Sequence, residues 1–164
     1  MKVVPLHNGP NRIDLRGDGH QDLVFEGRRT SWTAHGYNTY TFYVRVNLGD
    51  SKSKAAFWTI VPFSGDKLPN DQDSVRTVEG ADCLLRDVVV LRKTMFDPVT
   101  VVIANRKFGS SYIDKQPVTF SIYRLSQSKN DPYILTFDLS MRLHSKEKYC
   151  DVDKAMEKEL GIRL

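Results

Sequence analysis

Two stretches of the chain alternate between apolar and polar residues at every second position. Residues 40–48 place Tyr, Phe, Val, Val and Leu against Thr, Tyr, Arg and Asn, and residues 133–143 repeat the pattern. Successive side chains of an extended strand point to opposite faces, so each stretch predicts a long strand with one buried and one solvated face. We expect Met141 and Leu143 on the buried face of the second strand, and Arg142 on its solvated face.

Further strands are predicted elsewhere in the chain. Residues 118–123 alternate in the same way, after a proline that suits a strand start. Residues 55–61, 88–91 and 99–104 are apolar on both faces, which is typical of central strands with both sides covered. Residues 22–28 add one more strand. Turn-rich segments connect them, and no internal repeat or low-complexity linker divides the chain.

One helix is predicted, at the C-terminus. Asp151 is a favourable N-cap, Val152, Ala155, Met156 and Leu160 follow at helical spacing, and Gly161 suits the position after the last turn. We expect the apolar stripe of this helix to cover one sheet face. Seven or so short strands with one short C-terminal helix predict an all-β fold, either an antiparallel β-sandwich or a partly closed barrel.

Length and charge favour a globular protein. We expect residues 1–164 to form a single domain from which a leader has been removed, since no charged-then-apolar segment opens the chain. No apolar run is long enough for membrane insertion. The formal net charge is only +4, and the Lys and Arg residues are interspersed with 20 acidic residues instead of forming one basic stripe. This pattern disfavours nucleic acid as a partner. Basic pairs such as Arg28-Arg29, Arg92-Lys93 and Arg106-Lys107 are interpreted as solvated strand ends.

The two cysteines, Cys83 and Cys150, have no metal-ligand spacing. If they form a disulfide, the chain-entropy estimate for the long loop is roughly 4 kcal/mol of stabilisation, and the protein belongs in an oxidising compartment. The bond would also pin the helix to the strand that begins near Arg86. The alternative, two separate thiols in a cytosolic protein, is equally compatible with the spacing.

The stretch DLRGDGHQD, residues 14–22, resembles a calcium loop. Asp14, Asp18 and Asp22 fall at positions one, five and nine of the EF-hand pattern, but position three is Arg16 and position twelve is Phe25. We therefore predict no metal there. The carboxylates are expected to accept hydrogen bonds from nearby backbone N–H groups in a glycine turn, partly neutralised by the arginine.

Four blocks together carry a family resemblance. They are the residues 13–25 (IDLRGDGHQDLVF), 34–43 with Ala-His-Gly-Tyr and Thr-Phe-Tyr, 108–120 (FGSSYIDKQPVTF) and 149–153 (YCDVD). The chain resembles the CarG-like carbapenem self-resistance family from about residue 13 to residue 161. Arg16 and the run from Arg29 to Trp32 depart from the usual family pattern.

The resemblance implies a non-catalytic periplasmic protein that confers intrinsic resistance to carbapenems. It implies export and an oxidised Cys83–Cys150 pair. Independently of the resemblance, we expect no cofactor or metal. The partner would be a carbapenem or another β-lactam, or else another resistance or cell-wall protein whose pathway is shielded. Exposed apolar sheet surface is compatible with a homodimer.

Hydrolytic apparatus is weakly represented in the sequence. Ser-x-x-Lys occurs at residues 51–54, 126–129 and 145–148, but all three lie in predicted loops or strand ends, without the accompanying Ser-Asp-Asn or Lys-Thr-Gly. The four histidines lack zinc-ligand spacing. We therefore expect no catalytic residue. Two alternative functions stay open. One is an unrecognised β-lactam hydrolase, and the other is an extracellular calcium-dependent interaction module, which the loop at residues 14–22 and the predicted β architecture suggest.

Binding of a small anion requires a cation, apolar walls and a few placed donors. Residues 28–43 and 107–115 are the richest sources of such groups. The predicted ligand-binding residues are Arg28, Arg29, Trp32, His35 and Tyr112.

Overall fold

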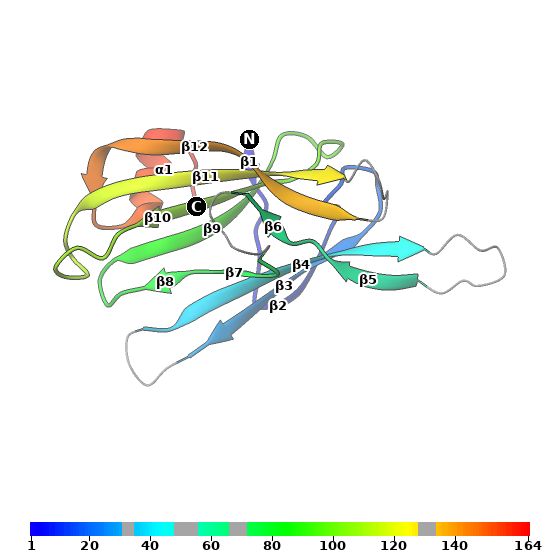
Figure 1. Cartoon of the computed structure of the whole chain (residues 1–164), viewed down its shortest axis with the longest axis horizontal. Coiled ribbons are helices and arrows are strands. Elements are labelled where there is room, and N and C mark those ends of the chain that lie inside the picture. The colour runs from blue at the N-terminus through cyan, green and yellow to red at the C-terminus, as the bar shows by residue number, and fades with distance from the viewer. Residues whose placement is uncertain (31–34, 48–55, 66–71, 128–133) are drawn as a thin grey trace.

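The computed structural model of the chain describes residues 1–30, 35–47, 56–65, 72–127 and 134–164. These residues form two separate sheets that face one another, with a single short helix on the outer side of one sheet (Figure 1). The predicted antiparallel sandwich with a C-terminal helix is confirmed, and the sheets do not close into a barrel. No helix in the described part of the chain is long and apolar enough to cross a membrane.

The larger sheet follows the order β1-β9-β10-β11-β12-β6, and β8 pairs with β9 beside this path. Its strands are antiparallel except for the short parallel pairing of β6 with β12. Their bounds are β1 Lys2–Val3, β6 Phe63–Ser64, β8 Val78–Glu79, β9 Leu84–Arg92, β10 Thr100–Arg106, β11 Gln116–Gln127 and β12 Leu135–Tyr149.

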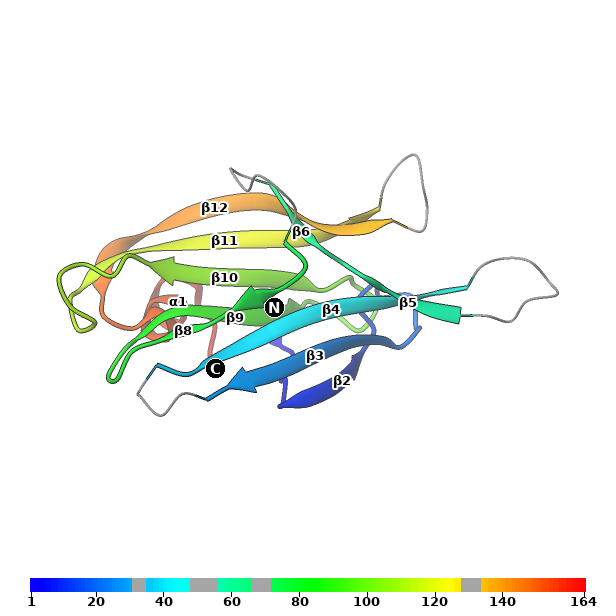
Figure 2. The same cartoon turned by 60° about the horizontal axis from the view of Figure 1, so that its bottom comes forward.

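The smaller sheet follows the order β2-β3-β4-β5, with β7 paired to β4. All these pairings are antiparallel. The bounds are β2 Gly9–Ile13, β3 Asp22–Arg29, β4 Tyr37–Asn47, β5 Ala56–Ile60 and β7 Val75–Arg76. The turned view shows this sheet as a second layer below the larger one (Figure 2).

An aromatic cluster packs between parts of the two sheets. Phe42 of the smaller sheet meets Phe63 and Phe137 of the larger sheet edge-on, with ring centroids 5.5 and 5.1 Å apart. Phe63 also stacks on Phe137 at 5.0 Å. All three side chains are at most 1% exposed. Aromatic pairs of this kind contribute about 0.5–1.5 kcal/mol each beyond their area burial, so this cluster fixes how the sheets face one another.

The helix α1, Val152–Leu160, covers the outer side of the larger sheet, as predicted. Its buried residues Val152, Ala155 and Met156 belong to a second apolar cluster with strand residues such as Val102 and Phe120. Asp151 caps the helix by accepting hydrogen bonds from the backbone N–H groups of Asp153 and Lys154, and Gly161 ends it with a left-handed φ of 68°.

The predicted disulfide between Cys83 and Cys150 is present. It joins the residue before β9 to the residue before the N-cap of α1. The side chain of Asp151 reinforces this link, because it also accepts a hydrogen bond of 3.1 Å from the backbone N–H of Leu84. Helix and sheet are therefore joined covalently and by a shared cap.

Two strand predictions are wrong in part. Residues 56–60 form the edge strand β5 instead of a covered central strand, and Phe57, Trp58 and Ile60 are 36–43% exposed. In β12, the predicted buried face ends at Leu139: Met141 and Leu143 are 49% and 37% exposed. The predicted central strands at residues 88–91 and 99–104 are confirmed as β9 and β10. Residues 48, 55 and 133 of the predicted strands lie outside the described residues.

Candidate functional site

Arg28, His35 and Tyr112, three of the predicted ligand-binding residues, gather around Glu79 at one end of the sandwich. Arg28 is fully engaged there: its two terminal nitrogens donate to the two carboxylate oxygens of Glu79 at 2.8 and 2.9 Å, and one also reaches Asn38 at 3.0 Å. This pairing raises the pKa of Arg28. The ion pair ties the end of β3 to β8, so the charge of Arg28 is already matched.

His35 and Tyr112 form an aromatic stack beside that ion pair. Their ring centroids lie 4.8 Å apart, and Nδ1 of His35 lies 3.4 Å from the carbonyl oxygen of Glu79. Gly80 packs so closely under Tyr112 that an added Cβ would lie 2.6 Å from the ring. This close approach explains why the position carries glycine. Of the other two predicted residues, Arg29 ends β3 and pairs with Tyr37, and Trp32 lies outside the described residues.

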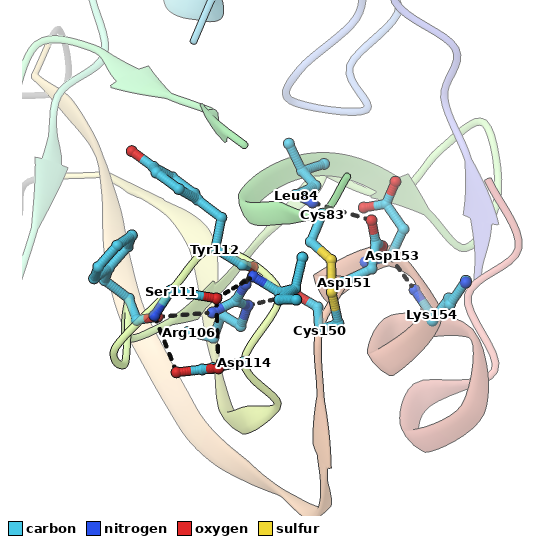
Figure 3. Close-up of a disulfide and its surroundings, with 12 residues drawn as sticks. Cys83, Leu84, Arg106, Ser111, Tyr112, Asp114, Cys150, Asp151, Asp153 and Lys154 are labelled. Atoms are coloured by element: carbon cyan, nitrogen blue, oxygen red, sulfur yellow. Dashed lines mark hydrogen bonds between the residues drawn. A yellow bond between two sulfur atoms is a disulfide. The ribbon is translucent and has the colours of Figure 1, made fainter. Parts of the chain in front are cut away.

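Arg106 organises the loop that carries Tyr112, and the sequence interpretation of this arginine was wrong. It is 3% exposed instead of solvated, and its guanidinium donates to the backbone carbonyls of Lys107, Phe108, Tyr112 and Cys150. Figure 3 shows this guanidinium beside the disulfide, pointing into the loop. Asp114 closes the loop by accepting hydrogen bonds from the backbone N–H groups of Ser110 and Ser111 at 2.7 and 3.0 Å.

The loop at residues 14–22 adopts the predicted glycine turn. Asp14 accepts hydrogen bonds from the backbone N–H groups of Gly17, Asp18 and Gly19, at distances between 2.7 and 3.2 Å. Asp22 is fully buried and is bound by Arg16 through two nitrogens. The oxygens that a calcium ion would need are therefore engaged with the protein itself. Among the described residues there is no group of three or more His, Cys, Asp or Glu that could hold a metal ion.

A cleft of about 840 Å³ lies between the two sheets, beyond the aromatic cluster. Its described lining residues include three arginines and a histidine but no Asp or Glu. They are Tyr37, Thr39, Gln72, Ser74, Val75, Arg76, Arg86, Ile103, Asn105, Thr119, Ser121, Tyr123, Arg142 and His144. The volume falls within the ordinary range of small-molecule sites, about 300–1,000 Å³. The cleft is therefore a cationic, hydroxyl-rich space of ligand size.

A β-bulge in β12 turns Arg142 and His144 toward this cleft. Tyr123 pairs with Leu139 but Ile122 pairs with Met141, so Ser140 has no partner in the ladder. An unpaired residue reverses which face the following side chains occupy. Arg142 therefore pairs with Ser121 on the cleft side, whereas the unbroken alternation predicted it on the opposite side from Leu139.

Arg86 lies at the cleft from β9, and Arg76 approaches it from β7 of the other sheet. The Nε of Arg86 donates to Oδ1 of Asn105 at 2.9 Å. Burial, and then the neighbouring charge of Arg76, lower the pKa of Arg86. The guanidinium of Arg76 lies over the ring of Tyr37, 5.1 Å from its centroid. Of the sequence-predicted site, none of the four described residues Arg28, Arg29, His35 and Tyr112 lines this cleft.

Asp87, the next residue of β9, faces the opposite way and meets Asp153 of the helix. The two carboxyl groups share a hydrogen bond. Burial, followed by the charges of Asp87 and Asp151, raises the pKa of Asp153 to about 7. Asp153 lies near the disulfide (Figure 3), on the side of the sheet that packs against the helix and away from the cleft.

The Ser-x-x-Lys matches do not form a site in the described structure. Residues 51–54 lie outside the described residues, as does Lys129 of the second match. The third lies at the end of β12, where the hydroxyl of Ser145 is hydrogen-bonded to backbone groups of Val118 and Glu147. A Ser-x-x-Lys nucleophile needs a helix start, which residues 145–148 do not provide.

These features define a disulfide-pinned, helix-covered antiparallel β-sandwich with a cationic cleft between its sheets. The sequence model of the CarG-like family, described as "Carbapenem resistance protein CarG-like", matches residues 6–158. The chain therefore belongs to the CarG-like family, as the sequence resemblance indicated. A solved structure titled "Crystal structure of CarG" shares the fold, with a TM-score of 0.76 and 21% identity over 100% of both chains. No curated protein sequence matches the chain significantly.

Proposed function

We propose that this protein protects a bacterium from carbapenems by binding the intact drug in the periplasm, without hydrolysing it. The observation that carries the proposal is the cleft between the sheets, which offers arginine, amide and hydroxyl groups in a space of about 840 Å³. A carbapenem is a small molecule with one carboxylate on a fused ring. Such ligands are held by concave sites with a cation and a few directed donors.

Family membership supports resistance as the biological setting. The family description names carbapenem resistance, and the match extends over most of the chain. The disulfide supports an oxidising compartment, since disulfides persist there and are rare in the cytosol. In a bacterium the periplasm is the compartment that a β-lactam must cross.

The groups in the cleft favour binding over turnover. The closest approach to a nucleophile and base is the hydroxyl of Thr119, 3.2 Å from Nδ1 of His144. Both residues lie on solvated neighbouring strands, and His144 has no carboxylate partner within the described part of the chain. An activated hydroxyl normally requires a base that a third group orients. We therefore place no catalytic residue here.

The test is a titration of the purified, disulfide-bonded protein with a carbapenem, followed by heat and by the absorbance of the drug. Binding heat with undiminished absorbance over hours would support sequestration. Absorbance that disappears at sub-stoichiometric protein would identify a hydrolase and overturn the proposal. Neither heat nor loss of drug would overturn drug binding and point instead to a protein of the resistance or cell-wall pathway as the partner.

A further inference from the structure

The inner face of the larger sheet changes character along its length. At one end it carries Tyr123 and Phe137, which pack into the aromatic cluster against the smaller sheet. At the other end the same face carries polar side chains from four adjacent strands. These are Arg86 of β9, Asn105 of β10, Thr119 and Ser121 of β11, and Arg142 and His144 of β12. An antiparallel sandwich normally buries apolar residues on this face, so a polar half needs a separate explanation.

Two arginines from opposite sheets line the cleft at this polar half. Arg86 is half-buried on the larger sheet, and the exposed Arg76 belongs to the smaller sheet. They are close enough that the charge of Arg76 lowers the pKa of Arg86, and no carboxylate contributes to that shift. Neither arginine forms an ion pair with a described Asp or Glu. Like charges brought together in a partly desolvated space destabilise the unliganded protein unless an anion joins them.

Both arginines are held in place by contacts that do not neutralise their charge. Asn105 accepts from Nε of Arg86, which leaves its terminal N–H groups as the remaining donors. Arg76 lies over Tyr37, whose phenol oxygen accepts hydrogen bonds from Arg29 and Arg76. These two hydrogen bonds, that of Arg29 first, lower the pKa of Tyr37. Fixed guanidinium groups lose little freedom when they bind a planar carboxylate through two parallel hydrogen bonds.

We infer that Arg76 and Arg86 form a carboxylate-binding clamp between the two sheets. The clamp takes one carboxylate of a small organic anion, while Ile103 and Tyr123 of the same cleft contact its apolar body. The inference rests on the proposed function, in which that carboxylate belongs to a carbapenem. It identifies the recognised group, and it predicts that the cleft also accepts other small oxyanions weakly.

The experiment measures binding of a carbapenem, and of the methyl ester of the same carbapenem, by calorimetry at low ionic strength. The proteins are the unmodified chain, Arg76→Gln, Arg86→Gln and Arg86→Lys. The matched control is Arg124→Gln, which makes the same charge change on an exposed residue of β11 outside this cleft. Thermal unfolding of each variant verifies folding, and Arg76→Gln, at an exposed position, serves if Arg86→Gln does not fold.

The clamp predicts that either glutamine substitution weakens binding of the acid by about 10- to 100-fold, as expected for loss of a hydrogen bond to a charged group. Arg86→Lys is expected to recover only part of the affinity, because lysine keeps the charge without the planar fork. The ester should bind the unmodified chain as weakly as the acid binds the variants. Arg124→Gln should bind like the unmodified chain.

The result that overturns the clamp is equal affinity of the acid for the unmodified chain and for both glutamine variants. That result would leave the proposed function intact, since the drug would bind elsewhere. If the unmodified chain binds no carbapenem, the proposed function fails, and inorganic phosphate tests the clamp by itself. The readout is the NMR signal of the Arg86 Nε–H group, which donates a hydrogen bond to Asn105. Added phosphate should shift this signal in the control variant Arg124→Gln but not in Arg76→Gln, which lacks one arginine of the clamp. The absence of any phosphate-induced shift would overturn the clamp as well.

Discussion

Two consecutive charged residues of β9 lie on opposite faces of the larger sheet, and their surroundings differ. Arg86 points to the inner side and opens into the cleft, which we call the cleft face, whereas Asp87 points to the outer side beneath α1, which we call the helix face. On the cleft face, a second cation lies nearby, and none of the described lining residues is acidic. On the helix face, Asp153 adds a second acid, and its raised pKa lets the pair share a proton. On the helix face the two acids therefore meet each other, whereas on the cleft face Arg76 and Arg86 have no ion-pair partner among the described residues.

The largest effect on stability is expected from removing the disulfide, which lies on the helix face only. Changing Cys83 and Cys150 to Ser opens a closure between positions 67 apart. The chain-entropy estimate is a loss of about 4 kcal/mol in the free energy of unfolding. Urea denaturation of the double variant measures this loss, with the reduced unmodified chain as a comparison. Equal stability of the oxidised and reduced forms would contradict the structural role of the bond.

The next effect tests the packing of the helix face. Met156→Ala removes a fully buried side chain from the cluster between α1 and the larger sheet. We expect the free energy of unfolding to fall by about 3 kcal/mol, within the range for such truncations. Chemical denaturation provides the measurement, and Lys154→Ala on the exposed side of the same helix is the control. A change below about 1 kcal/mol would show that the helix contributes little packing energy.

The acid pair gives a smaller effect that depends on pH. The folded pKa of Asp153 is raised to about 7 from 3.8, so the folded state binds more protons than the unfolded state between these values. Its contribution to stability therefore falls as pH rises from about 4 to about 7 and is constant above. Asp153→Asn keeps a donor toward Asp87 without a titratable group.

We expect Asp153→Asn to be the more stable protein at pH 8, by on the order of 1 kcal/mol, and the difference to shrink toward pH 4. Thermal unfolding across this range measures it. A stability difference that does not vary with pH would contradict a shared proton on the helix face.

The smallest effect is expected on the cleft face. In Arg86→Gln the loss of the hydrogen bond to Asn105 is offset by relief of the repulsion from Arg76. We expect the free energy of unfolding to stay within about 0.5 kcal/mol of the unmodified value in the absence of ligand. Urea denaturation with and without phosphate is the measurement. A loss of several kcal/mol would show that Arg86 is required for the fold, and the contrast between the two faces would disappear.

Much of the fold follows from local sequence signals. Alternation predicts the long strands, continuous apolar runs predict β9 and β10, and Asp151 with Gly161 predicts both ends of the helix. These signals act over a few residues and are readable without tertiary context. The disulfide required the family resemblance, because the spacing of the two cysteines left both alternatives open.

The site was less predictable, for physical reasons that particular residues illustrate. The bulge at Ser140 leaves no clear mark in the sequence, yet it decides that Arg142 and not Met141 faces the cleft. In the sequence, Arg106 has the features of a solvated strand end, and only the folded loop supplies the backbone carbonyls that bind its guanidinium. The predicted residues Arg28, His35 and Tyr112 do come together, but the ion pair with Glu79 takes up the charge assigned to ligand binding. Whether they contact a ligand stays a prediction.

The bulge in β12 also has an evolutionary consequence. It divides a single strand into two halves, in which opposite sets of alternating positions face the inside of the sandwich. The half that packs into the aromatic cluster and the half that lines the cleft can therefore diverge separately. An insertion or deletion at this position would exchange Arg142 and His144 for Met141 and Leu143 while leaving the aromatic half of the strand unchanged. A single event of this kind would therefore change which side chains line the cleft, while the rest of the scaffold stays the same.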